Sequence, residues 1–146
     1  MTQYFTSDAE IEAHGLGLLD RSLPKARWTH AGHFGAALWL LRARPDIETA
    51  AEMPGIIRAY NEATGGVNSD TEGYHETIPQ ASLRAARAFL ERYPDSAPLH
   101  AIVDDLMASP LGKPEWLMAH WRRETLFSVA ARRAWVGPDL QPLPFP

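Results

Sequence analysis

The sequence predicts an all-α fold, an irregular bundle of about five to seven helices. Apolar residues recur at helical spacing along most of the chain, and no stretch alternates apolar and polar residues as a half-buried strand does. Twelve prolines divide this periodic sequence into short segments. With 146 residues, of which 45% are hydrophobic and 22% charged, the chain fits a single domain over residues 1–146.

The first half of the chain predicts three helical segments, over about residues 8–21, 27–43 and 46–64. Ser7 and Glu10 form an S-x-x-E capping box at the start of the first segment. The second segment ends before Pro45, because the residue before a proline avoids helical geometry. Asp46 is the expected N-cap of the third segment, and Pro54 is expected to kink or divide it.

The second half predicts helices over about residues 78–93, from 98 to a break at 109–114, and over 115–135 in one or two pieces. The glycine-rich stretch from Gly65 to Gly73 is the expected surface loop before them. Thr77 and Gln80 form a second capping box. Residues 1–6 are expected to be flexible. The tail at 137–146 is expected to be extended, because its prolines recur too often for a helix.

Charge and composition exclude several classes of partner. The net charge is −4, so the chain has no overall positive field that would attract nucleic acid. The longest apolar run, residues 34–41, is too short to cross a membrane, and the N-terminus has no signal-peptide pattern. The absence of cysteine rules out disulfides and agrees with a cytoplasmic location. A homo-oligomer is compatible with the sequence.

Two distant motifs predict a shared polar site. His30 and His33 are three residues apart at the start of an apolar helix, so their rings lie on one face. His75 and Glu76 stand at a loop-to-helix junction, where side chains can be directed inward. Three histidines, His30, His33 and His75, could bind a divalent metal such as zinc, iron, manganese or nickel. Glu76 would then be a fourth ligand, an outer carboxylate or a general base.

The same residues also allow interpretations without a metal. His30 and His33 could instead bond to carbonyl groups and to Glu76, and Glu76 could simply complement the positive end of the following helix. Aromatic and amide side chains could line a small-ligand pocket beside the histidines, although each also suits a helical core. These candidate ligand-binding residues are Trp28, Tyr60, Asn61, Tyr74 and Trp121.

The motifs W-T-H-x-x-H at residues 28–33, A-Y-N at 59–61 and G-Y-H-E-T at 73–77 carry a resemblance. Together they resemble a family of small bacterial helical proteins, over about residues 20–140. The resemblance implies that His30, His33, His75 and Glu76 form one unit, and it implies no particular reaction. Pro79 departs from the helix-friendly residue expected after Y-H-E-T-I, so the start of that helix could differ here.

Three functions are therefore expected as alternatives. The first is a metal-binding helical protein that acts as a hydrolase or transferase on a small molecule, with Glu76 as the catalytic group. The second is a metal-free module that binds a small ligand. The third is a structural or oligomerising protein in which the histidines and Glu76 form a buried network. The sequence leaves open whether the protein is an enzyme.

Overall fold

The computed structural model describes residues 3–146, and all regular structure in this range is helical, which confirms the predicted class. The α-helices are α1 (Asp8–Asp20), α2 (His30–Ala43), α3 (Thr49–Ala63), α4 (Thr77–Leu90), α5 (Leu99–Ala108), α6 (Arg123–Leu126) and α7 (Val129–Arg133). Short 3₁₀ helices are η1 (Lys25–Arg27), η2 (Pro110–Gly112) and η3 (Pro114–Ala119). Within the described residues, no helix combines the length and apolar character needed to span a bilayer.

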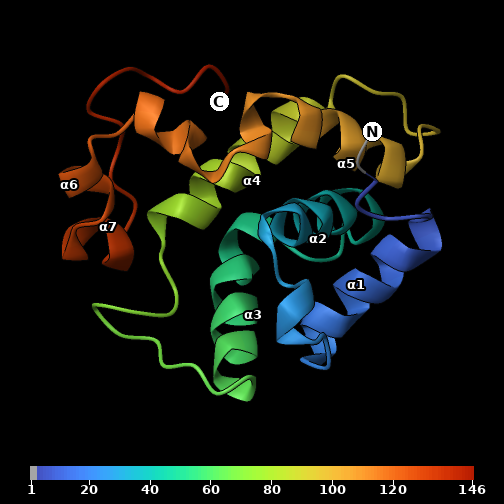
Figure 1. Cartoon of the computed structure of the whole chain (residues 1–146), viewed down its shortest axis with the longest axis horizontal. Coiled ribbons are helices and arrows are strands. Elements are labelled where there is room, and N and C mark those ends of the chain that lie inside the picture. Colours follow the sequence, from blue (N-terminus) through green and yellow to red (C-terminus); the bar gives the residue numbers. More distant parts are fainter. Residues whose placement is uncertain (1–2) are drawn as a thin grey trace.

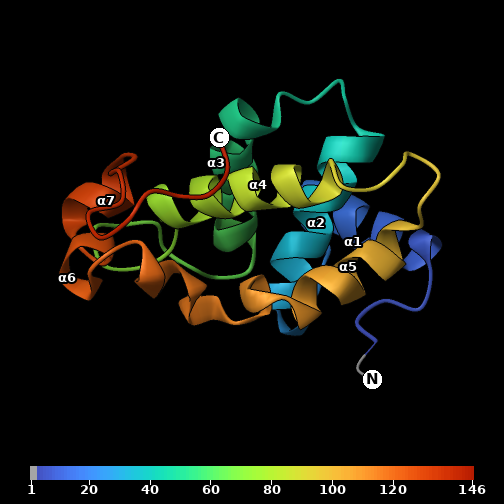
Figure 2. The same cartoon turned by 90° about the horizontal axis from the view of Figure 1, so that it is seen from above.

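Helices α1, α2 and α5 pack together at one end of the molecule, and α6 and α7 lie at the opposite end (Figures 1 and 2). Helices α3 and α4 lie between these ends. Helix α2 contacts α1, α3, α4 and α5, and every residue from Phe34 to Leu40 is buried. Such an all-round apolar helix is typical of the centre of a core.

Glycines allow α1 and α2 to approach closely. A Cβ atom added at Gly15 of α1 would lie 2.2 Å from the Trp39 ring of α2. One added at Gly32 of α2 would lie 2.5 Å from the Arg27 carbonyl oxygen and 3.1 Å from His14. His14 is buried at this crossing, and its Nε2 bonds to the Gly32 carbonyl at 2.9 Å. The crossing therefore requires small residues on both helices.

The start of α1 follows the predicted capping box in part. The Glu10 backbone N–H donates to Ser7 Oγ at 3.2 Å, as a capping box requires. The Glu10 carboxylate instead accepts from the Thr6 backbone N–H at 2.9 Å, one residue earlier than expected. Residues 1 and 2 of the segment expected to be flexible lie outside the described residues, whereas Phe5 is buried next to Gly35.

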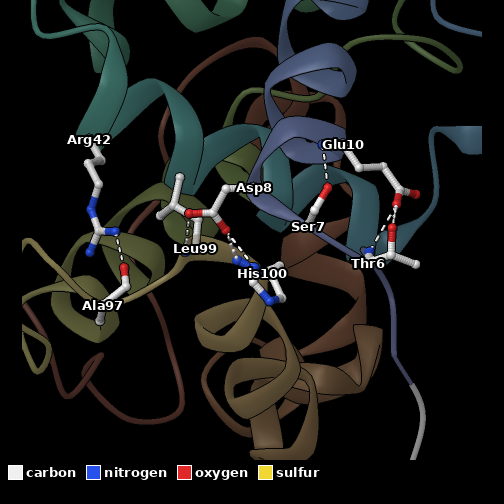
Figure 3. Close-up of polar contacts among 8 residues, drawn as sticks. All are labelled: Thr6, Ser7, Asp8, Glu10, Arg42, Ala97, Leu99 and His100. Atoms are coloured by element: carbon white, nitrogen blue, oxygen red, sulfur yellow. Dashed lines mark hydrogen bonds and ion pairs between the residues drawn. The ribbon is translucent and has the colours of Figure 1, made fainter.

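Asp8, at the first turn of α1, also caps the first turn of α5 (Figure 3). Its carboxylate accepts from the Leu99 backbone N–H at 3.1 Å and from the His100 backbone N–H at 3.0 Å, and it contacts His100 Nδ1 at 2.6 Å. Arg42 donates to the Ala97 carbonyl just before this turn. The side chain of Pro98, the N-cap of α5, offers no capping acceptor, so a residue 91 positions away supplies it.

Replacing Asp8 with alanine is expected to destabilise the fold by about 1–2 kcal/mol, because two N–H groups of α5 lose their acceptor. Partial burial raises the pKa of Asp8, but hydrogen bonds from His100 and Leu99 outweigh this and lower it below the ordinary value of 3.8. The ionised form is thus favoured in the fold. The ionised carboxylate therefore contributes fully to the unfolding free energy above pH ~4. This contribution is lost as the pH falls through the pKa of Asp8 in the folded state.

Urea denaturation of wild type and Asp8→Asn at a series of pH values tests this cap. The difference in unfolding free energy should shrink as the pH falls from about 5 to about 2, since protonated aspartate resembles asparagine. A difference that is independent of pH would contradict the role of the charged carboxylate.

Of the two outcomes expected at Pro54, a kink or a division, the division does not occur, because α3 runs continuously through this residue. Proline lacks the N–H that would bond to the Ala50 carbonyl four residues earlier. The side chain of Gln80 in α4 takes its place and donates from Nε2 to that carbonyl at 2.9 Å. The expected N-cap is also wrong: α3 begins at Thr49, and Asp46 pairs with Arg44 at 2.9 Å instead.

A double-mutant cycle between Pro54 and Gln80 tests whether the Gln80 side chain replaces the backbone N–H that proline lacks. Gln80→Ala is expected to cost about 1 kcal/mol in wild type, because the Ala50 carbonyl loses its donor. In a Pro54→Ala background the cost should approach zero, since the restored N–H at residue 54 bonds to the same carbonyl. Equal costs in both backgrounds, measured by chemical denaturation, would show that the two donors do not replace each other.

The predicted Thr77–Gln80 capping box does not form. The N-cap of α4 is Glu76, and the Ile78 backbone N–H donates to His75 Nδ1 at 3.1 Å. Thr77 is fully buried, and its hydroxyl donates to the carbonyls of Ala131 and Ala134 at 2.7 and 3.0 Å. Thr77 therefore joins α4 to the C-terminal region.

The C-terminal region is more broken than expected. Residues 115–135, predicted to be helical in one or two pieces, contain most of η3 and the short helices α6 and α7. Residues 137–146 contain no helix, and within them Leu143 and Phe145 pack on core residues. Figure 2 shows this last segment running alongside α4.

Candidate functional site

A cavity of about 590 Å³ lies where the two predicted motifs meet. His30 and His33 line it from the first turns of α2, and Tyr74 and His75 line it from the segment before α4. These pieces are about 40 residues apart in sequence, and the fold places them on one cavity, as the motifs suggested. Glu76 does not line this cavity.

The opposite wall comes from the C-terminal region, between η3 and the residue after α6. Glu115 and Trp116 of η3 line the cavity, as do Arg123 of α6 and Phe127 directly after it. Phe127 is 52% exposed, and the Arg123 guanidinium lies 5.1 Å from the centre of its ring. Sequence reasoning noted aromatic and arginine residues in this stretch but did not connect Trp116, Arg123 or Phe127 with the histidine site, because only tertiary packing brings them together.

Most of the cavity lining is apolar. Helix α3 contributes Met53 and Ile57, and α4 contributes Ile78 and Leu83. The Trp28 indole lies before α2 and completes the wall next to the histidines. An apolar cavity with a few polar groups is the usual form of a small-molecule site.

The His33 ring has a fixed orientation. Its Nδ1 lies 2.6 Å from the Thr29 carbonyl oxygen, which can only accept, so Nδ1 carries the proton in that bond. The ring is tilted 37° against the Trp28 indole, with 3.9 Å between ring centres. Nε2 is left without a hydrogen-bond partner among residues 3–146. In the neutral ring, this nitrogen is an acceptor with a free lone pair.

The other two histidines at the cavity form hydrogen bonds that link distant parts of the main chain. His30 Nε2 bonds to the Leu111 carbonyl at 2.8 Å, which ties α2 to η2. His75 is buried and uses both ring nitrogens: Nε2 bonds to the Leu126 carbonyl at 2.8 Å, and Nδ1 accepts from the Ile78 N–H at 3.1 Å. Burial lowers the pKa of His75, so this ring is held neutral.

Tyr74 and Glu76 form a pair beside the cavity. The Tyr74 hydroxyl donates to Glu76 Oε1 at 2.5 Å, and Arg58 lies 4.7 Å from the centre of the tyrosine ring. Burial, reinforced by the hydrogen bond to the Glu76 carboxylate, raises the pKa of Tyr74. Glu76 is thus engaged with a tyrosine, and no hydrogen bond joins it to His30, His33 or His75 in the described part of the chain.

No group of three or more His, Asp or Glu side chains in residues 3–146 is arranged to hold a metal ion. His75 would have to break its bond with Ile78 or Leu126 to become a ligand beside His30 and His33. The three-histidine metal site remains a prediction from sequence. Elemental analysis of protein purified without a nickel column would test it.

The five aromatic and amide candidates separate into two groups. Trp28, Asn61 and Tyr74 line the cavity. Tyr60 and Trp121 do not: both are buried, the Tyr60 hydroxyl donates to the Leu23 carbonyl at 2.8 Å, and the Trp121 indole donates to the Val136 carbonyl at 2.9 Å. These two side chains have core positions with their polar groups satisfied by the main chain.

His33 is expected to titrate well below a free histidine. Desolvation by the surrounding walls lowers its pKa to about 4, against the opposing effect of the Thr29 carbonyl, and His30 and His14 lower it further. Solvent also reaches the ring, so we expect the measured pKa to lie between this value and the ordinary 6.5. NMR titration of the ring protons measures it, and a pKa at or above 6.5 would contradict a crowded, neutral ring.

Comparison with protein-family models, with curated proteins and with solved structures found no match.

Proposed function

We propose that the protein binds a small, largely apolar organic molecule in the cavity between α2, α4 and α6. The observation that supports this most strongly is the cavity of about 590 Å³, which is built from three separate parts of the chain. This volume lies within the range of sites for small ligands and cofactors, roughly 300–1,000 Å³. Of the functions expected from sequence, a metal-free ligand-binding module agrees best with this lining.

The composition of the walls indicates the kind of ligand. Trp28, Trp116 and Phe127 offer aromatic surfaces, which suit a planar or aromatic molecule. Polar groups are few at the cavity: those of Tyr74 and His75 already have partners within the protein, whereas the buried indole N–H of Trp116 has none among residues 3–146. A ligand with an apolar body and a single polar group therefore fits better than a sugar or a nucleotide.

A fragment screen tests the proposal. Aromatic alcohols, acids, amines and hydrocarbons are added to ¹⁵N-labelled protein, and we expect a subset to shift the indole N–H signal of Trp28 and to raise the melting temperature. A screen in which no fragment shifts Trp28 or stabilises the protein would contradict the proposal.

A cavity-filling variant locates the binding. Ser82 of α4 lines the cavity, so Ser82→Phe should occupy part of its volume and weaken every true ligand at least tenfold. Ala101 of α5 is exposed and does not line the cavity, so Ala101→Phe is the matched control and should bind normally. Binding that survives Ser82→Phe would place the ligand elsewhere.

A further inference from the structure

We propose that His33 Nε2 is the hydrogen-bond acceptor that selects the ligand, and that the ligand class is neutral aromatic molecules with a hydroxyl or N–H donor. This inference rests on the proposed function, because it assigns a residue and a chemical class to the same cavity. It goes further in naming an atom that would recognise the polar end of the ligand.

One hydrogen bond fixes the tautomer of His33. The bond from Nδ1–H to the Thr29 carbonyl leaves the proton on the ring nitrogen nearer to the main chain. Nε2, the nitrogen farther from the main chain, then carries the lone pair. The carbonyl that fixes this state belongs to the N-cap of α2, so the ring is held by the helix start itself.

His33 lines the cavity, and its side chain is exposed although it lies on an otherwise buried helix. Contact with the Trp28 indole, at 3.9 Å between ring centres, restrains it. An acceptor held in one orientation loses little entropy when a donor binds, which favours recognition.

Other polar groups also line the cavity. The Tyr74 hydroxyl is engaged with Glu76, and both nitrogens of His75 are engaged with main-chain groups. His30 donates from Nε2 to the Leu111 carbonyl, so its half-buried Nδ1 is a second ring nitrogen without a hydrogen-bond partner among residues 3–146. Trp116, which also lines the cavity, has a buried indole N–H without a partner in the same residues. Glu115 and Arg123 also line the cavity, and both side chains are charged and exposed.

A neutral imidazole with a free lone pair attracts a donor and repels an anion, and the low pKa of His33 keeps the ring neutral at pH 7. The class that satisfies both the apolar walls and this acceptor is an aromatic alcohol or azole. A carboxylate of the same size would place a lone pair of its oxygen against the lone pair of His33 Nε2, and the two would repel each other.

Three probes that share one aromatic ring system test the inference: 2-naphthol carries a donor, whereas 2-methoxynaphthalene and naphthalene carry none. In wild type, 2-naphthol is expected to bind about fivefold more tightly than 2-methoxynaphthalene, the usual size of one added hydrogen bond. In His33→Phe, which keeps a ring against Trp28, this ratio should fall to about one. Ser82→Ala is the matched control, because it removes a hydroxyl from the same cavity without touching His33, and it should keep the ratio.

A second readout does not depend on affinity. Long-range ¹⁵N NMR of wild type should show His33 Nε2 as the unprotonated nitrogen, and 2-naphthol should shift its signal upfield as the lone pair accepts a proton donor. A protonated Nε2, an unchanged signal on binding, or a ratio that persists in His33→Phe would overturn the inference while leaving the cavity as a ligand site. If none of the three probes binds wild type, the proposed function fails for this ligand class, and the assignment to His33 fails with it.

Discussion

Replacing Thr77 with valine is expected to cost about 3 kcal/mol of unfolding free energy, although the two side chains have nearly the same shape. The Thr77 hydroxyl donates to the carbonyls of Ala131 and Ala134 and accepts from the Val136 N–H at 3.1 Å. Thr77 has no exposed surface, so water cannot replace the lost partners. Chemical denaturation measures the loss.

The control for this prediction is Thr77→Ser, which keeps the hydroxyl and removes only a methyl group. It should cost about 1 kcal/mol. In the valine variant, hydrogen exchange should also quicken at the Val136 amide, because its acceptor is gone. If valine and serine cost the same, the hydroxyl does not hold the C-terminal region to α4.

Replacing Gly15 with alanine should be about as damaging, by about 3 kcal/mol, for a steric reason. The new Cβ would lie 2.2, 2.6 and 2.7 Å from three atoms of the Trp39 ring. Trp39 is 3% exposed, so its ring has no free space into which it can turn. Helices α1 and α2 would have to move apart, and the thermal or chemical unfolding midpoint would fall.

Gly55 provides a matched control within the same protein. It also lies in a helix, α3, but a Cβ added there meets no atom within 4 Å. Gly55→Ala should therefore stabilise the fold by roughly 0.5–1 kcal/mol, since alanine favours a helix more than glycine does. A stable Gly15→Ala variant with an unchanged Trp39 environment would contradict the close packing of α1 on α2.

The parts of the fold that depend on local signals could be predicted from the sequence. Ser7 caps α1, and the helical class follows from apolar spacing. The failures share one physical cause, a partner distant in the chain. Pro54 does not break α3, because Gln80 supplies the missing donor, and Thr77 does not cap α4, because its hydroxyl bonds to residues more than 50 positions later.

The candidate site also has parts that could be predicted from the sequence and parts that could not. His30, His33, Tyr74 and His75 carry recognisable motifs, and their meeting at one cavity could be anticipated. The wall that contains Phe127 could not, because only tertiary packing of short helices brings it there. The sequence could not show that His33 keeps a free ring nitrogen whereas His75 does not, because this depends on which ring nitrogen bonds to which main-chain group.

A crystal structure of the protein soaked with 6-bromo-2-naphthol tests the central claim most directly, because bromine gives an anomalous signal that locates the ligand without interpretation. We expect one strong bromine peak inside the cavity between His33 and Phe127, with the naphthol oxygen within hydrogen-bond distance of His33 Nε2. A cavity closed by side chains, or bromine bound only at other places on the protein, would contradict the account.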